Sequence, residues 1–260
     1  MVSWHAYPLP GTGEPGRISL RVTTALPRRD LLAALPPDYE QDDRRYPVVY
    51  LHDGQNLFDP ATSFARDWGL VDTLNRRARE GLRAIVVGIP NRGRRRRSEY
   101  SPFRDLLHGG GGGDRYLRFL VEEVKPLVDA SFRTRTGRAH TVIGGSSLGG
   151  LISLYAVYRH AGIFGAASVQ SPALWFARRA MLRFVAREPR PPESRIHLDV
   201  GTAEGAETLE QARELRGLLV EAGYVPGADL SYVEEATAGH DEGAWGRRFD
   251  AALPFLLGSG

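Results

Sequence analysis

The sequence of 260 residues contains no cysteine, which excludes disulfide bonds, thiol nucleophiles and cysteine metal sites. Long apolar runs are also missing, and none approaches the roughly 18 residues of a membrane-spanning helix. Residues 1–8 lack a basic segment followed by an apolar one, so no signal peptide is predicted. Together these absences favour a soluble, cytoplasmic protein without a membrane partner.

Lysine is almost absent, since Lys125 is the only one and nearly all basic residues are arginine. The formal net charge of +3 is mild and indicates no particular partner. Arg92–Arg97 forms a basic run, which is more often a solvated loop than a nucleic-acid patch. We therefore expect no nucleic-acid partner.

Gly109–Gly113 is a run of five glycines that lacks the Gly-Lys-Ser/Thr ending of a phosphate-binding loop. We predict a flexible loop without helix or strand, followed by a helix that Asp114 caps. The ordinary composition and the absence of an internal repeat favour one domain, residues 1–260.

Hydrophobic patterns of period two and period 3.6 alternate along most of the chain. The expected strands are Arg17–Leu26, Arg29–Leu35, Tyr46–His52, Arg83–Ile89, Thr141–Ile143, Phe164–Gln170, Arg195–Val200 and Asp229–Glu234. The expected helices are Asp67–Glu80, Tyr116–Val128, one following Gly150, Ala173–Ala186, Thr208–Ala222 and Ala244–Leu257. This order predicts an α/β fold with a mostly parallel central sheet, antiparallel N-terminal strands and helices on both faces.

One turn carries the strongest chemical signal. Gly145-x-Ser147-x-Gly149 lies between the apolar strand and the following helix, which is the context of a nucleophile elbow. Only Ser147 has glycine at both −2 and +2, whereas Ser146 has leucine at +2. We predict Ser147 as a nucleophile; the alternative is an ordinary glycine-rich turn.

A serine nucleophile needs a base, and the chain order in this fold is serine, acid, histidine. His240 lies in a glycine-flanked loop after the last strand and is the expected base, while His197 lies inside a strand and is expected to be structural. Glu204 follows the strand Arg195–Val200 and is the expected acid. Asp199, within that strand, is the rival.

Backbone N–H groups of Leu148 and Gln55 are the expected oxyanion donors, because one donor follows the nucleophile and the other follows an earlier strand. Asp53 is expected to stabilise a turn rather than bind a metal. Aromatic side chains could line a substrate pocket or pack in the core. These candidates are Trp175, Phe176 and Phe58.

Several segments resemble one family. They are Tyr46–Asp59, Glu99–Phe103, Gly144–Leu151, Ser171–Trp175, Asp199–Glu204, and Gly239-His240 with Trp245. They resemble the putative esterase (esterase-D-like) family of α/β-hydrolases, which includes formylglutathione hydrolases, feruloyl and acetylxylan esterases, siderophore trilactone esterases and mycolyltransferases. The resemblance covers the chain from about residue 28 to the end and implies the same serine, histidine and carboxylate.

These observations predict a serine carboxylic-ester hydrolase that acts on a small-molecule ester without cofactor or metal. An acyltransferase would use the same residues with an alcohol in place of water, and some family members work with a serine–histidine pair alone. A non-catalytic binding protein on a hydrolase fold is the alternative of another class. The oligomeric state is left open.

Overall fold

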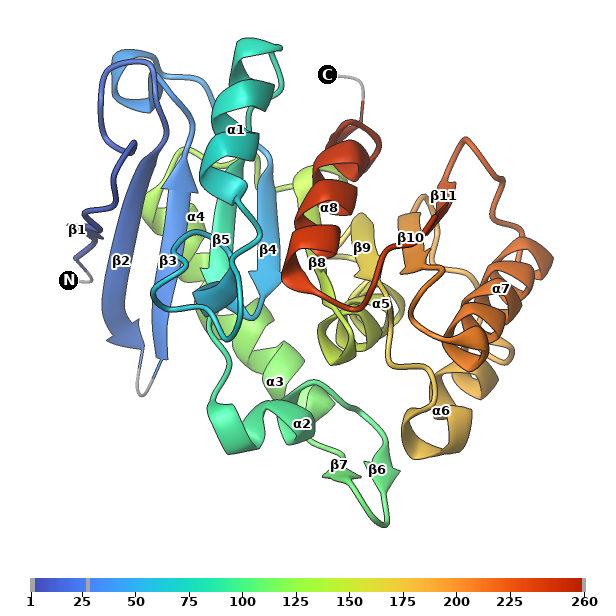
Figure 1. The fold of residues 1–260 in the computed structure, drawn as a ribbon. Coiled ribbons are helices and arrows are strands. Elements are labelled where there is room, and N and C mark those ends of the chain that lie inside the picture. The colour runs from blue at the N-terminus through green and yellow to red at the C-terminus, as the bar shows by residue number, and fades with distance from the viewer. Residues whose placement is uncertain (1–2, 27–28, 259–260) are drawn as a thin grey trace.

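The computed structural model describes residues 3–26 and 29–258. A nine-stranded sheet runs through it in the order β1-β2-β3-β5-β4-β8-β9-β10-β11 (Figure 1). The strands are β1 (His5–Ala6), β2 (Ser19–Leu26), β3 (Arg29–Leu35), β4 (Val48–His52), β5 (Ile85–Ile89), β8 (Thr141–Ser146), β9 (Ala166–Gln170), β10 (Arg195–Gly201) and β11 (Leu230–Glu235). Neighbours from β1 to β5 pair antiparallel and those from β5 to β11 pair parallel. The predicted mixed sheet is confirmed.

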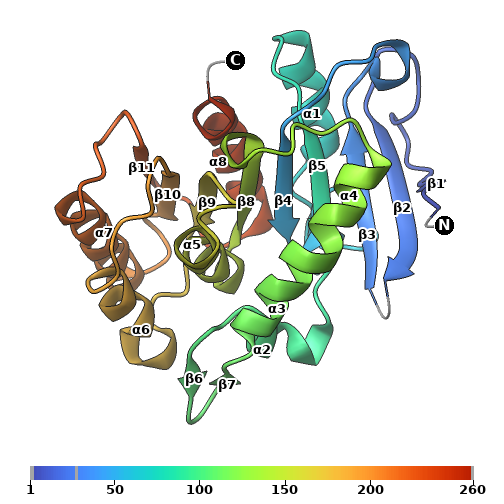
Figure 2. The same cartoon turned by 180° about the vertical axis from the view of Figure 1, so that it is seen from behind.

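Helices cover both faces of this sheet (Figures 1 and 2). They are α1 (Leu70–Arg79), α2 (Arg96–Glu99), α3 (Gly113–Phe119), α4 (Lys125–Ser131), α5 (Leu148–Arg159), α6 (Phe176–Val185), α7 (Ala206–Glu221) and α8 (Glu242–Leu257). α1 and α8 lie on one face, and α3, α4 and α5 lie on the other. A two-stranded hairpin, β6 (Arg104–Asp105) and β7 (Gly109–Gly110), projects beyond the carboxyl ends of the parallel strands.

Successive side chains of each strand point to opposite faces of the sheet, which explains why a layer of hydrophobic core lies on each face. In β4, Val48 and Tyr50 pack into the core cluster under α3–α5, whereas Val49 and Leu51 pack into the cluster under α1 and α8. Because both faces are buried, the central strands are continuously apolar. The carboxyl ends of the parallel strands meet at one edge, where sites form in such sheets.

The glycine run is more ordered than its sequence predicts. Gly109 and Gly110 form β7, and α3 begins at Gly113. A Cβ on Gly110 would lie 2.4 Å from the Phe103 carbonyl oxygen, so glycine at this position allows close backbone packing. The predicted cap is also wrong, because Gly112 is the N-cap residue and Asp114 instead accepts a hydrogen bond from the Tyr155 hydroxyl.

Two helices differ from their predicted extents. The helix expected over Tyr116–Val128 begins at Gly113, contains a π-helical turn at Leu120–Val124 and runs to Ser131. The helix expected over Ala173–Ala186 spans Phe176–Val185, and residues 177–179 adopt positive φ. Hydrophobic periodicity does not register such local changes of helical geometry.

Candidate active site

Ser147 lies at a sharp turn between β8 and α5, as the glycine spacing predicts. Its φ of 58° and ψ of −121° are the angles of the first central residue of a type II′ turn, which favours glycine. Close packing explains the flanking glycines: a Cβ on Gly145 would lie 3.1 Å from the carbonyl carbon of Gly149 and 3.1 Å from Cβ of His52. The turn therefore holds a strained serine between two tightly packed elements.

A cavity of about 750 Å³ opens beside this turn. It is lined by Asp53, Gln55, Asn56, Thr62, Phe64, Ala65, Pro90, Asn91, Arg96, Ser146, Ser147, His240, Asp241, Glu242 and Trp245. Ser147, His240 and Gln55 thus share one cavity although they come from three distant segments. Its volume falls in the range of pockets for small organic molecules.

His240 is paired with Glu204. The imidazole Nδ1 lies 2.6 Å from Oε2 of Glu204, whose side chain is 1% exposed. Burial disfavours the charged carboxylate, but hydrogen bonds from His240, Ser171 and the Gly201 N–H together outweigh it and hold the pKa of Glu204 below its ordinary value of 4.5. Asp199 does not contact His240: its carboxylate pairs with His197 and Arg248.

The two predicted oxyanion donors occupy the starts of helical turns. Leu148 is the first residue of α5, and Gln55 lies in the 3-10 helix Gly54–Asn56. N–H groups in the first turn of a helix have no intrahelical acceptor. The N–H of Ser147 itself is used, since it donates to the Gln170 carbonyl at 2.9 Å. Leu148, as the first residue of α5, therefore carries the first N–H after Ser147 that lacks an intrahelical acceptor.

The basic run contributes one residue to the cavity. Arg96 donates two hydrogen bonds of 2.8 Å to the carboxylate of Asp53, which also accepts one from Asn91 at 2.7 Å. The interpretation of this run as a solvated loop is therefore wrong for Arg96, whose side chain is 28% exposed. The expectation that Asp53 stabilises its turn is consistent with its left-handed φ of 55° and with its carbonyl accepting the Asn56 N–H at 2.9 Å, while its side chain makes these more distant contacts as well.

The predicted aromatic lining residues lie outside this cavity. Phe58 and Phe176 are buried in the core, and Trp175 is half-exposed and packs against His108. Trp245 lines the cavity instead, with its ring edge against His240 at a centroid distance of 4.8 Å. Ser171 and Arg248 also contact Glu204, and sequence reasoning missed both roles.

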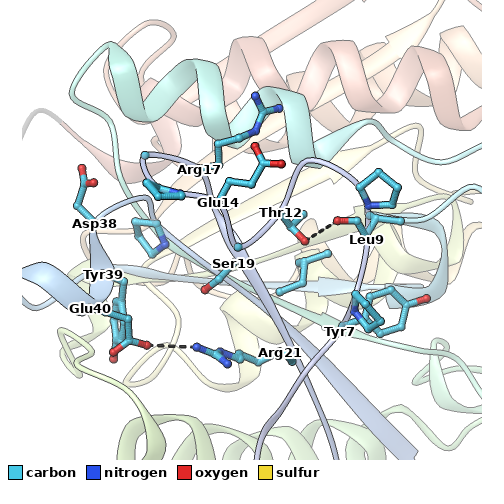
Figure 3. A pocket seen from close by; sticks show the side chains of 18 of the residues that line it. Tyr7, Leu9, Thr12, Glu14, Arg17, Ser19, Arg21, Asp38, Tyr39 and Glu40 are labelled. Atoms are coloured by element: carbon cyan, nitrogen blue, oxygen red, sulfur yellow. Dashed lines mark hydrogen bonds and ion pairs between the residues drawn. The ribbon is translucent and has the colours of Figure 1, made fainter.

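A second cavity, of about 690 Å³, lies between the N-terminal segment and the loop at residues 36–41 (Figure 3). None of the predicted site residues lines it. Across residues 3–26 and 29–258, no group of three or more His, Asp or Glu side chains is placed to hold a metal ion. No helix in that same part of the chain is long and apolar enough to cross a bilayer.

The family described as "Putative esterase" matches this chain over residues 27–256. The uncharacterised protein YbbA of Bacillus subtilis is 26% identical over 241 residues, which cover 86% of this chain and 90% of YbbA. A siderophore enterobactin esterase of Emericella nidulans is 29% identical over 52% of this chain and 48% of the relative. A siderophore triacetylfusarinine C esterase of Aspergillus fumigatus is 31% identical over 50% and 45%. The chain thus spans about half the length of these two siderophore esterases.

Solved structures share the fold. The BES protein from Bacillus cereus aligns with a TM-score of 0.72 and 19% identity over 98% of this chain and all of that one. The siderophore hydrolase EstA from Aspergillus nidulans aligns with a TM-score of 0.69 and 21% identity over 98% of both chains. A ferulic acid esterase aligns with a TM-score of 0.68 and 20% identity over 88% and 92%.

Proposed function

Since the chain belongs to the putative esterase family, we propose that it is a serine carboxylic-ester hydrolase with Ser147 as nucleophile, His240 as base and Glu204 as acid. The observation that carries this proposal is the 2.6 Å contact between His240 and the buried Glu204, beside a cavity that Ser147 also lines. A base held by a buried carboxylate next to a serine on a strained turn is the arrangement that acyl transfer requires.

In the proposed first step, Oγ of Ser147 bonds to the ester carbonyl carbon while its proton passes to Nε2 of His240. Negative charge develops on the carbonyl oxygen, and the N–H groups of Leu148 and Gln55 stabilise it. Each such donor is typically worth about 2.7–4 kcal/mol in the transition state. The carbon–oxygen bond to the alcohol then breaks, and His240 returns the proton to the leaving alcohol.

Water completes the reaction by attacking the acyl-serine while His240 takes a proton from it; the bond between the acyl carbon and Oγ of Ser147 then breaks, the acid leaves, and His240 returns the proton to Oγ. An alcohol acceptor in place of water would give acyl transfer with the same residues. Most residues that line the cavity are polar, including Asp53, Arg96 and Glu242, but Phe64 and Trp245 add apolar surface. This mixed lining suits a small or medium ester, and the siderophore esterases among the relatives make siderophore esters sensible members of a substrate panel.

The test is hydrolysis of short-chain p-nitrophenyl esters by the wild type, Ser147→Ala and Ser146→Ala, with fluorophosphonate labelling and peptide mapping. We expect turnover by the wild type and Ser146→Ala, no turnover by Ser147→Ala, and a label on Ser147. A label on Ser146 would contradict the assigned nucleophile. A folded wild type that neither labels nor hydrolyses any ester would refute the proposed function. Adding alcohol acceptors and measuring product partitioning separates hydrolysis from acyl transfer.

A further inference from the structure

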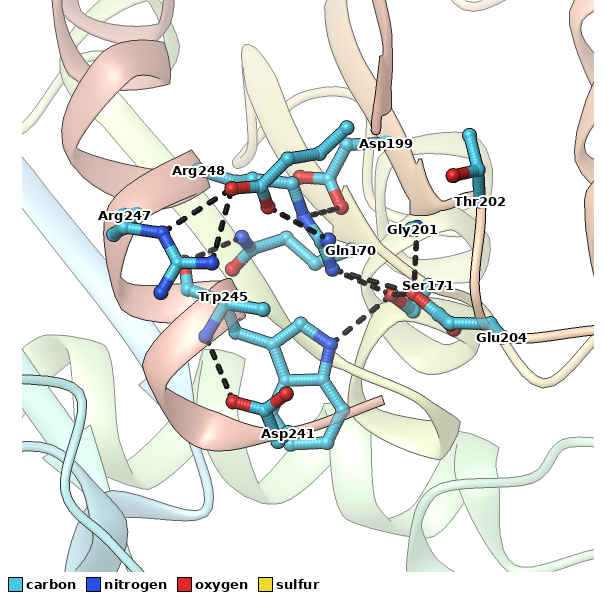
Figure 4. A network of polar contacts seen from close by, with 12 residues as sticks. Gln170, Ser171, Asp199, Gly201, Thr202, Glu204, Asp241, Trp245, Arg247 and Arg248 are labelled. Atoms are coloured by element: carbon cyan, nitrogen blue, oxygen red, sulfur yellow. Dashed lines mark hydrogen bonds and ion pairs between the residues drawn. The ribbon is translucent and has the colours of Figure 1, made fainter. Parts of the chain in front are cut away.

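Ser171 lies at the centre of a buried polar network behind Glu204 (Figure 4). Its hydroxyl oxygen is 2.6 Å from Oε1 of Glu204, 3.0 Å from the indole Nε1 of Trp245 and 2.8 Å from a terminal guanidinium nitrogen of Arg248. Ser171 follows β9 with a φ of 40°, in the left-handed region. Its N–H donates to the carbonyl of Asp199 at 2.9 Å, so the backbone holds this unusual conformation in place.

Counting protons fixes the direction of every hydrogen bond at this hydroxyl. A serine hydroxyl has one proton to donate and two lone pairs to accept with. The indole and guanidinium nitrogens can only donate, so Trp245 and Arg248 occupy both lone pairs of Ser171. The single proton of Ser171 must therefore point at Oε1 of Glu204, which accepts it.

Oε1 of Glu204 also accepts the N–H of Gly201 at 2.7 Å, and Arg248 lies 3.4 Å away. An oxygen that faces only donors has no place for a proton of its own, so this side of Glu204 is held as carboxylate. The other carboxylate oxygen of Glu204, Oε2, contacts Nδ1 of His240. Because a carboxylate can only accept, Nδ1 of His240 carries the proton, and Nε2 of the neutral ring is the free base.

We propose that Ser171, Trp245 and Arg248 are positioning residues that fix the orientation of Glu204 and, through it, the tautomer of His240. This inference rests on the proposed function, because the Nδ1-protonated tautomer is the one that can take a proton from Ser147. Ser171 and Arg248 do not line the cavity, so they act on the base rather than on the substrate.

Arg248 is itself held by further charged groups. Its Nε lies 2.8 Å from Oδ1 of Asp199, and a terminal nitrogen lies 3.1 Å from Oε2 of Glu235. Asp199 is fully buried and also contacts Nε2 of His197 at 3.1 Å. The titratable and charged groups around the network are His197 and Asp199 on β10, Glu204 after it, Glu235 on β11, His240 and Asp241 before α8, and Arg247 and Arg248 on α8. One buried guanidinium thus links three carboxylates.

The adjacent arginine provides a matched control. Arg247 pairs with Glu235 as Arg248 does, but its side chain is 62% exposed. Within the described residues it makes no hydrogen bond or ion pair with Glu204. The variants are Ser171→Ala, Arg248→Met and Arg248→Lys, with Arg247→Met as control. Each is assayed for kcat and KM from pH 5 to 9 on the ester that the wild type hydrolyses best.

We expect Ser171→Ala and Arg248→Met to lower kcat about 10- to 100-fold with little change in KM, which is less than the roughly 10⁴-fold cost of a fully wrong tautomer. Removing the guanidinium also takes a positive charge away from Glu204 and favours its protonation, so the acidic limb of kcat/KM should move to higher pH in Arg248→Met. Arg248→Lys, which keeps the charge, should restore part of this shift. Arg247→Met should match the wild type.

The tautomer itself is read from the ring-nitrogen NMR signals of His240. We expect a single Nδ1-protonated form in the wild type and a mixture of tautomers in Ser171→Ala. If Arg248→Met fails to fold, Ser171→Ala still decides, because it removes only one hydroxyl. An active wild type whose kcat, pH profile and His240 spectrum are unchanged in Ser171→Ala would overturn the positioning role and leave the esterase proposal intact. A wild type that neither reacts with the fluorophosphonate nor hydrolyses any ester would instead refute the proposed esterase function on which this inference rests.

Discussion

Arg96 and Asp53, 43 residues apart, are joined by two parallel hydrogen bonds of 2.8 Å in the wall of the Ser147 cavity. The guanidinium also lies over the ring of Tyr100, 5.1 Å from its centroid. The Asp53 side chain is 8% exposed, so removing Arg96 would leave a buried carboxylate without its charged partner.

Arg96→Met should therefore destabilise the protein by about 1–3 kcal/mol, the usual cost of leaving a buried polar or charged group unsatisfied. Asp53→Asn should have a smaller effect, because the amide oxygen can still accept one hydrogen bond. Urea denaturation of both single variants and the double variant measures their coupling. Arg95→Met, at an exposed neighbour, is the control and should change little. A coupling energy near zero would show that the pair does not stabilise the cavity wall.

His52 should make stability depend on pH. Burial of the whole ring lowers its pKa from 6.5 to about 3. Between those values the unfolded chain binds a proton that the folded protein does not, so the stabilisation is complete above pH 6.5 and falls as pH drops toward 3. Each pH unit in that window costs about 1.4 kcal/mol. Urea denaturation at pH 7.5, 6 and 5 should show this slope. His52→Gln should flatten it, whereas His5→Gln, at an exposed histidine, should leave it unchanged.

The elbow glycines can be tested against a helix glycine. Gly145→Ala would bring a Cβ to 3.1 Å from both the Gly149 backbone and His52, so we expect a loss of about 1–3 kcal/mol from overpacking. Gly217 lies within α7, and a Cβ there meets nothing within 4 Å. Gly217→Ala should stabilise the protein by about 0.5–1 kcal/mol through helix propensity. Equal effects at the two positions would show that close packing does not explain Gly145.

The parts of the site that the sequence predicts are those specified by short local patterns. Glycine spacing identifies the turn at Ser147, and chain order together with a position in a loop after a strand favours His240 and Glu204 as the predicted base and acid. Ser171 and Arg248 are 77 residues apart, and their contact depends on how α8 packs against β9 and β10. The sequence pattern does not distinguish Arg96 from the other arginines of Arg92–Arg97. No periodicity in the sequence indicates which arginine of such a run turns inward, because that depends on a carboxylate supplied by the turn that follows β4.

The backbone at Ser147 predicts a conflict between stability and function. Its φ of 58° and ψ of −121° suit glycine and strain any residue with a Cβ. Ser147→Gly should therefore be about 1–2 kcal/mol more stable than Ser147→Ala, the approximate cost of a left-handed backbone for a residue with a Cβ. Both variants should lack esterase activity, because neither has a hydroxyl.

The adjacent Ser146 is the opposite case, because it is the last residue of strand β8. There Ser146→Gly should be less stable than Ser146→Ala, by about 0.5–1 kcal/mol, because glycine loses more conformational freedom on folding. Thermal and urea unfolding of the four variants measures both differences. If the glycine variant were less stable than the alanine variant at Ser147 as well as at Ser146, Ser147 would store no backbone strain. A reversal of sign would show that Ser147 is held in a conformation that the fold maintains at a cost in stability.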